Sequence, residues 1–187
     1  MEETLQASLN KGETILWRSG TEPFETLDRT NKPDFLRKCL IGGFIALAIT
    51  IAMIAAGGFD QKTLLIIVIT FLLCAIPTIN VLSDASKLRK IEYIATTERL
   101  IVLRDSVRSA FYSQIQAAAF REDEDGHVSL LCGSEGMKAK PKKFRELCVV
   151  GANNTDSGSE CERFCFYAPR DRAALQNILH ERMPSLF

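Results

Sequence analysis

Two long runs without a charged side chain constrain this sequence more than any other feature. They cover residues 39–59 and 63–83, with twenty-one residues each. A helix rises about 1.5 Å per residue and the hydrocarbon core of a bilayer is about 30 Å thick, so about 20 apolar residues form a span. Only Asp60, Gln61 and Lys62 separate the runs, which leaves room for a tight turn alone. The pattern predicts a transmembrane hairpin of two helices.

Two alternatives explain the apolar runs less well. Helices that are apolar on every face also occur as buried hairpins in soluble proteins. Residues 84–187, however, are too few to enclose two helices of this length. A cleaved signal peptide is also disfavoured, because the first run begins near residue 39, exceeds a signal peptide's apolar region in length, and is followed at once by a second run.

The positions of the charges predict the orientation of the hairpin. The 187 residues include 23 basic and 23 acidic side chains, so the zero net charge gives no indication of a nucleic-acid partner. Arg37 and Lys38 precede the first run, and Lys87, Arg89 and Lys90 follow the second. By the positive-inside rule both termini face the cytoplasm. We therefore expect a multi-pass protein of the inner (plasma) membrane.

Small residues recur at four-residue spacing in the first run. Such stripes let helices approach closely, and this one consists of Gly42, Ala46, Ala48, Ala52 and Ala56. The simplest partner is the second run. Self-association of hairpins from two chains is the competing use, so a homo-oligomer is an open possibility.

The rest of the sequence predicts short strands and one closing helix. Residues 1–36 form a polar N-terminal segment whose single strand candidate, 14–17, we expect to dock on the larger part. Residues 37–83 form the hairpin and residues 84–187 a cytoplasmic domain. Its strand candidates are 91–95, 99–104, 107–112, 115–121, 127–132, 144–150 and 161–168. A final helix after Pro169 has one apolar face, formed by Ala174, Leu175, Ile178 and Leu179. The expected class is α+β, with a seven-stranded antiparallel barrel or sandwich closed by this helix.

One short motif adds a resemblance. Residues 93–101 read Tyr-Ile-Ala-Thr-Thr-Glu-Arg-Leu-Ile, which resembles the Y-x-x-T-x-x-R-L hallmark of bacterial pleckstrin-homology-like (PH-like) domains in small membrane proteins. In that family a Gly-Glu-x-x-Leu-Trp type segment precedes a two-helix hairpin, as Gly12, Glu13, Leu16 and Trp17 do here. The resemblance implies a PH-like fold and membrane attachment, and it supplies no catalytic residues. The loop between Cys132 and Phe144 departs from the pattern, so its path is left open.

The cysteines do not predict disulfides. The six lie at positions 39, 74, 132, 148, 161 and 165, and the last four would face a reducing cytoplasm. Cys161 and Cys165, if both lie in one strand, are about 13 Å apart, which excludes bridging by one disulfide or one metal ion. A zinc site that also draws on Cys132 and Cys148 is the alternative to small buried apolar residues.

No motif predicts an enzyme. The sequence contains no nucleotide-binding fingerprint, nucleophile elbow or metal-ligand helix, so we expect no catalytic residue, no cofactor and no metal.

One basic cluster supports a functional hypothesis. It comprises Lys138, Lys140, Lys142, Lys143 and Arg145, five cations in eight positions. The plain interpretation is a solvated loop, and the functional one is adhesion to anionic lipid headgroups of the inner leaflet. The leading hypothesis is a membrane-anchored, non-catalytic binding or scaffold module that recruits a protein, a peptide or anionic lipid. The alternative is an oligomeric subunit of a membrane transport or export system.

Overall fold

The computed structural model describes residues 2–57, 61–150 and 160–187. The chain divides into two compact units. The first, which we call the α+β domain, combines Met1–Phe24 with Asp84–Phe187, and the second is the helical hairpin, Glu25–Ser83. The turn predicted around Asp60, the turn at 151–159 and the side chain of Ala56 lie outside the described residues.

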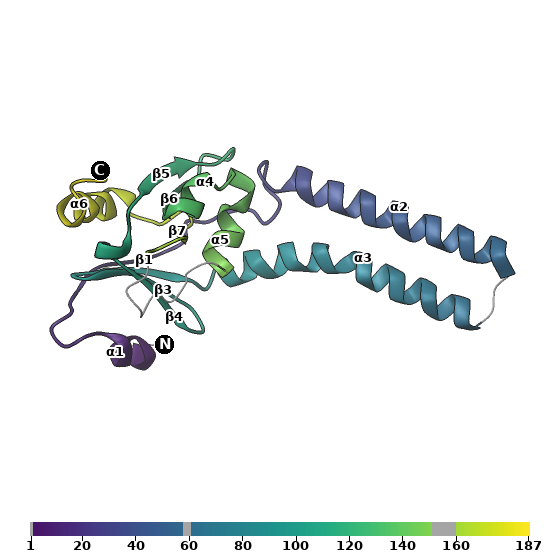
Figure 1. Cartoon of the computed structure of the whole chain (residues 1–187), viewed down its shortest axis with the longest axis horizontal. Coiled ribbons are helices and arrows are strands. Elements are labelled where there is room, and N and C mark those ends of the chain that lie inside the picture. Colours follow the sequence, from purple (N-terminus) through teal and green to yellow (C-terminus); the bar gives the residue numbers. More distant parts are fainter. Residues whose placement is uncertain (1, 58–60, 151–159) are drawn as a thin grey trace. The chain divides into compact units, whose positions relative to one another are not determined.

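The hairpin consists of two long helices, α2 (Lys32–Gly57) and α3 (Gln61–Leu88). They lie side by side and antiparallel in Figure 1. Within Lys32–Ala55 and Leu64–Leu88, windows of 18 residues have mean hydropathies of 2.2 and 2.6, so both helices are long and apolar enough to cross a membrane. Only 6% and 0% of their apolar windows are buried within the chain. A core helix of a soluble protein would be mostly buried, so this exposure disfavours the soluble-hairpin alternative.

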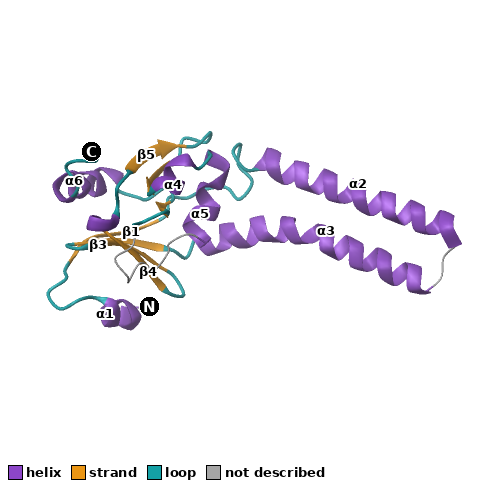
Figure 2. Cartoon of the chain, in the orientation of Figure 1, coloured by secondary structure: helices purple, strands orange, loops and turns teal. Residues whose placement is uncertain are grey.

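The described strands of the α+β domain form two antiparallel sheets (Figure 2). The first has the order β1-β2-β3-β4 and the second β5-β6-β7. The first sheet contains β1 (Ile15–Gly20), β2 (Glu92–Thr96), β3 (Arg99–Leu103) and β4 (Val107–Phe111). The second contains β5 (Ala118–Glu122), β6 (Val128–Cys132) and β7 (Phe164–Phe166). A 3₁₀ turn, η1 (Tyr112–Gln114), connects them.

The N-terminal strand is part of the larger domain, which confirms the expected docking. In β1, Trp17 pairs with Ala95 and Gly20 with Glu92. The domain is therefore assembled from two segments that the hairpin separates in the sequence. Residues 84–187 alone contain six of the seven described strands, and β1 supplies the seventh.

Alternating residues of the first sheet enter two separate apolar clusters. Tyr93 belongs to the main core, together with Phe166 of β7 and Leu175. Ile94 points to the opposite face of the strand, where Leu5 covers it in a smaller cluster. Leu5 lies on a short helix, α1 (Glu2–Ser8), which the sequence analysis did not predict.

The closing helix was predicted correctly. It is α6 (Arg172–Arg182), and its Leu175 and Leu179 are fully buried in the main core while Ile178 packs against it partly buried. Burial of Leu side chains of this kind stabilises a domain by about 1.5–3 kcal/mol each.

Two expectations about the domain were wrong, and of the two expected arrangements, barrel or sandwich, the barrel is not found. Residues 144–150 form a helix, α5 (Phe144–Val150), and not a strand. The last strand is confined to Phe164–Phe166, so it omits Cys161. No closed barrel is detected in the described part of the chain, since β4 and β5 belong to different sheets. The loop whose path was open folds into α4 (Ser134–Lys138) and a 3₁₀ turn, η2 (Pro141–Lys143), before α5 begins.

Candidate functional site

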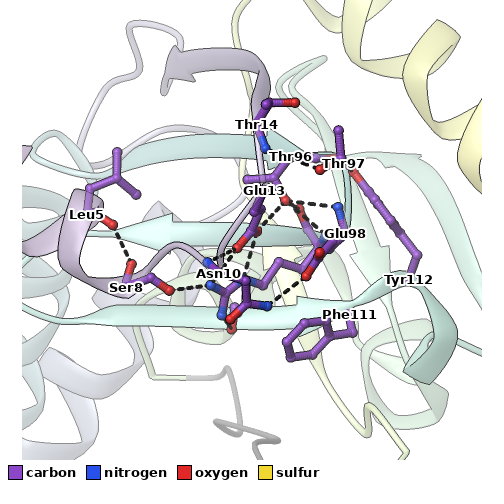
Figure 3. A network of polar contacts seen from close by, with 12 residues as sticks. Leu5, Ser8, Asn10, Glu13, Thr14, Thr96, Thr97, Glu98, Phe111 and Tyr112 are labelled. Atoms are coloured by element: carbon purple, nitrogen blue, oxygen red, sulfur yellow. Dashed lines mark hydrogen bonds and ion pairs between the residues drawn. The ribbon is translucent and has the colours of Figure 1, made fainter.

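Glu13 and residues of the 93–101 motif form a buried polar network (Figure 3). The Glu13 carboxylate has one oxygen that accepts hydrogen bonds from Thr96 Oγ1 at 2.6 Å and from Arg99 Nε at 2.9 Å. Its other oxygen accepts from Arg99 Nη2 at 2.9 Å and from the Asn10 amide at 2.8 Å. The side chains of Arg99 and Glu13 are only 7% and 0% exposed. The network joins the segment before β1 to the β2–β3 hairpin.

Other polar groups of the motif also form hydrogen bonds within the domain, whereas the buried Trp17 Nε1 has no hydrogen-bond partner among the described residues. Arg99 donates further to Ser109 Oγ at 3.2 Å and to the Ser8 carbonyl. The Tyr93 hydroxyl donates to the Tyr167 carbonyl at 3.0 Å and receives a hydrogen bond from Thr21 at 3.1 Å. These hydrogen bonds hold separate elements of the domain together.

The network also sets the ionisation of Glu13. Burial alone would raise the pKa of this carboxyl, but the hydrogen bonds from Arg99, Thr96 and the Asn10 amide outweigh it and hold the pKa below its ordinary value. Glu13 is therefore a carboxylate at neutral pH, matched to the Arg99 guanidinium.

The structure separates the predicted basic cluster into two parts. Lys138, Lys140, Lys142 and Lys143 are exposed, and we call these four residues the lysine surface. Two hydrogen bonds hold the segment that carries it, because Arg121 Nη1 donates to the carbonyls of Met137 and Ala139 at 2.9 and 3.1 Å. Within the surface, Lys143 forms an ion pair with Glu146.

Arg145 does not belong to this surface. It is 6% exposed, and its guanidinium lies 4.4 Å from the ring centroid of Phe24 and 5.2 Å from that of Tyr167. Such cation–π contacts stabilise a desolvated guanidinium by about 2 kcal/mol. Arg145 therefore packs inside the domain, where it cannot contact a lipid surface together with the lysines.

A second basic feature was not predicted. A cleft of about 600 Å³ lies where the end of β1, the start of β2 and the turn after β3 meet. We call it the basic cleft, and its charged lining residues are Arg18, Arg89, Lys90, Glu92, Arg104, Asp105 and Arg170. Five cationic and two anionic side chains leave a formal charge of +3 in a chain whose net charge is zero.

Several cations of the cleft are held in place by neighbouring groups. Arg18 donates twice to one Glu92 oxygen, from Nη2 at 2.6 Å and from Nε at 3.1 Å. Arg104 Nε pairs with Asp105 at 2.8 Å. Arg170 is fixed to β1, since its backbone amide donates to the Gly20 carbonyl and its Nε to the Thr21 carbonyl, both at 3.0 Å.

No local signal in the sequence could have found the cleft. Its cations come from four separate segments of the chain, so no single run of basic residues marks it. In the sequence, Arg89 and Lys90 indicate only the orientation of the hairpin in the membrane. Their convergence depends on the β1–β2 pairing across the hairpin, which places Arg18 opposite Ile94 and Gly20 opposite Glu92.

The stripe of small residues in α2 has two faces. Gly42 and Ala46 face α3, because Ala46 is 1% exposed and a Cβ added to Gly42 would lie 3.3 Å from the Cβ of Cys74. Ala48 and Ala52 are exposed within the single chain. Packing within the hairpin therefore involves Gly42 and Ala46, whereas the competing use, self-association of hairpins from two chains, would involve Ala48 and Ala52.

None of the six cysteines, all of which lie within the described residues, forms a disulfide. Burial raises the pKa of the Cys161 thiol to about 11 and keeps the pKa of Cys132 and Cys165 well above the ordinary value, so these thiols are protonated at neutral pH. Because Cys161 precedes β7, the spacing calculated for a shared strand does not apply. Within residues 2–57, 61–150 and 160–187 no three His, Cys, Asp or Glu side chains are grouped to hold a metal ion.

Comparisons with known proteins give no match: no family model, no curated protein and no solved structure is similar to this chain.

Proposed function

We propose that this chain is a membrane-anchored, non-catalytic binding module of the PH-like kind, whose α+β domain adheres to anionic lipid at the cytoplasmic surface of the inner membrane. The observation that carries the proposal is the exposure of all four lysines of the lysine surface on a domain that follows a candidate membrane span without a linker. Support for the PH-like kind comes from Glu13, Thr96 and Arg99, which interlock as structural motif residues should.

The energetics favour a reversible adhesion. Each basic residue near an anionic leaflet contributes about 1 kcal/mol, and exposed charges are screened over a Debye length of about 8 Å at physiological salt. The anchor keeps the domain close to the bilayer, so a weak and salt-dependent contact suffices. The acidic turn Glu122 to Asp125 would be repelled from the same surface.

Hydrogen exchange of the full chain in nanodiscs tests this function. We expect residues 138–143 to exchange more slowly in phosphatidylglycerol than in phosphatidylcholine nanodiscs, and the difference to shrink as salt is raised. Reversal of the four lysines to Glu should abolish the difference, and the turn at 122–125 serves as the internal control. Equal exchange in both lipids at low salt would contradict the lipid proposal and leave an acidic protein or peptide as the occupant to seek.

One observation favours a second candidate, an oligomeric subunit of a transport or export system. Ala48 and Ala52 present small side chains outward from α2, where another hairpin could approach closely. Crosslinking in membranes tests it, because Ala48→Leu with Ala52→Leu should abolish a crosslinked homo-oligomer. Gly43→Leu on the opposite side of α2 is the matched control, since no atom lies within 4 Å of its added Cβ. Absence of any oligomer in the wild type would exclude this candidate.

A further inference from the structure

We propose that the basic cleft binds a phosphomonoester group. This site is distinct from the lysine surface, and its argument rests on the proposed function only for the source of the ligand, a membrane lipid headgroup or a soluble phosphate ester. A phosphomonoester carries a charge of about −1.5 to −2 at neutral pH and three acceptor oxygens. These are the properties that the cleft's chemistry complements.

The first argument is charge. The formal charge of +3 is concentrated in a concave site of about 600 Å³. Clefts lined by one sign of charge focus the electrostatic field and raise the local concentration of the counter-ion. Both acidic side chains of the lining are already engaged, Glu92 by Arg18 and Asp105 by Arg104. Neither carboxylate is therefore available to neutralise an added cation, and an anion is the favoured ligand.

The second argument is preorganisation. Arg170 uses its Nε to hold the Thr21 carbonyl, and its Nη groups donate in no hydrogen bond among the described residues. A guanidinium fixed through Nε retains the two parallel donors that match phosphate oxygens. Because the side chain is already anchored, less conformational entropy is lost when these donors bind an anion.

A third observation concerns Arg104, which also lines the cleft. Its Nη1 is buried and has no hydrogen-bond partner within the described residues, although a buried donor left unsatisfied costs about 1–3 kcal/mol. Arg104 also borders a smaller cavity of about 10 Å³, whose size suits a single water. A water there or an anion in the cleft would satisfy this donor.

The position of the cleft along the chain indicates where the ligand is found. Arg89 and Lys90 directly follow α3, whose uncharged stretch ends six residues before Arg89, at Ser83. If α3 spans the bilayer, these two residues emerge at headgroup level, where lipid phosphates are abundant. A soluble phosphate ester offers the same group, and the experiment separates the two sources.

Calorimetric titration of the full chain in a nonionic detergent provides the test. The probes are short-chain phosphatidic acid, which ends in a phosphomonoester, short-chain phosphatidylglycerol, which has a phosphodiester, and glycerol 3-phosphate. We expect phosphatidic acid to bind about tenfold more tightly than phosphatidylglycerol, as the loss of one charged hydrogen bond implies. If glycerol 3-phosphate binds as tightly as phosphatidic acid, a soluble phosphate ester is sufficient as the ligand. If phosphatidic acid binds and glycerol 3-phosphate does not, the ligand is a membrane lipid.

Matched variants assign the binding to the cleft. Lys90→Gln with Arg170→Gln should weaken phosphatidic acid binding about tenfold or more. Lys140→Gln with Lys142→Gln removes the same amount of charge from the lysine surface. This double variant should change the affinity for phosphatidic acid less than about twofold. Lys90→Gln alone, at an exposed position, should still weaken binding about threefold if the double variant fails to fold.

Three results would overturn the proposal: no binding of either phosphomonoester, equal affinity for phosphatidic acid and phosphatidylglycerol, or equal loss in the two double variants. The last two would assign anion binding to diffuse charge. They leave the proposed function intact, because that function depends on the lysine surface and is measured separately by exchange in nanodiscs.

Discussion

At the scale of single residues, Glu13 and Arg99 dominate the polar interior of the domain. Each would be strongly unfavourable if buried alone, since an ion transferred from water to a protein interior loses several kcal/mol of solvation. Together they neutralise one another's charge. Thr96, Ser109 and the Ser8 carbonyl form hydrogen bonds with their remaining polar atoms. The pair makes the position of the N-terminal segment depend on a residue of β3.

We expect Glu13→Ala to lower the free energy of unfolding by about 3–5 kcal/mol, because it leaves the Arg99 guanidinium buried without its carboxylate. Glu13→Leu combined with Arg99→Met should recover most of that loss. Unfolding of the full chain in detergent can be followed by the fluorescence of Trp17, the single tryptophan, which is 7% exposed. Glu146→Ala, which removes the exposed pair with Lys143, is the control and should cost less than about 1 kcal/mol. Equal losses in both single variants would contradict the role of burial.

The same pair predicts a pH dependence. The pKa of Glu13 is lowered in the folded chain from its ordinary value of 4.5, so the unfolded state binds more protons in the acid range. The stabilisation is complete above pH 4.5 and is lost as pH falls through the folded pKa. Unfolding midpoints measured from pH 7 downward should therefore decline below about pH 4.5. The decline should be smaller in Glu13→Gln, and identical profiles would refute the assignment.

Arg145 illustrates what sequence can and cannot indicate about a site residue. Five cations in eight positions correctly predicted exposed charge at four of them. The fifth is buried because Phe24 and Tyr167, both distant in the sequence, provide aromatic faces on which its guanidinium stacks. The basic cleft escaped prediction for the same reason, since its cations meet only after β1 has paired with β2.

At the scale of elements, the mistaken strand at 144–150 has a recognisable cause. Its residues include Phe, Cys and two Val, which favour strands by composition. The buried positions are Phe144, Arg145, Cys148 and Val149, a spacing of four that is typical of a helix and not of an alternating strand. The helical spacing of these residues was present in the sequence, and it indicated the type of element better than the strand-favouring composition did. The two long helices were predicted correctly from the length of their uncharged runs, and α6 from the period of its apolar face.

The packing of the hairpin predicts a contrast between two adjacent glycines. A Cβ at Gly42 would lie 3.3 Å from the Cys74 Cβ and 3.4 Å from the Cys74 carbonyl oxygen, whereas one at Gly43 would meet no atom within 4 Å. Gly42→Leu should force α2 and α3 apart and lower the thermal midpoint of the full chain in detergent, because overpacking typically costs about 1–3 kcal/mol. Gly43→Leu should have little effect. Equal midpoints would mean that the helices do not approach closely at Gly42.

At the scale of the whole molecule, the hairpin is an insertion into the α+β domain. Phe24 and Asp84 bound the two segments of that domain, and β1 lies on one side of the insertion while its partner β2 lies on the other. The sequence predicted that the N-terminal strand docks on the domain, but it could not predict which strand β1 would join. Of the two arrangements that the sequence left open, the barrel is not found among the described strands, because its closure would require β4–β5 and β7–β1 pairings that no local pattern determines.

The two-segment domain predicts which soluble fragment will fold. Residues 84–187 alone lack β1, lose Trp17 from the core and leave Arg99 without Glu13, so we expect this fragment to be unfolded or aggregated. A fusion of residues 1–24 to 84–187 through a short Gly/Ser linker restores β1, the contribution of Trp17 to the core and the pair of Glu13 with Arg99. The junction is feasible because Thr21 Oγ1 lies 3.2 Å from the Leu88 carbonyl oxygen and the Arg89 guanidinium lies 5.5 Å from the Phe24 ring. Dispersed amide resonances and a cooperative urea transition in the fusion alone would support this arrangement. A cooperatively folded 84–187 fragment would show that β1 is dispensable, and the buried pair would then have a smaller role than its geometry implies.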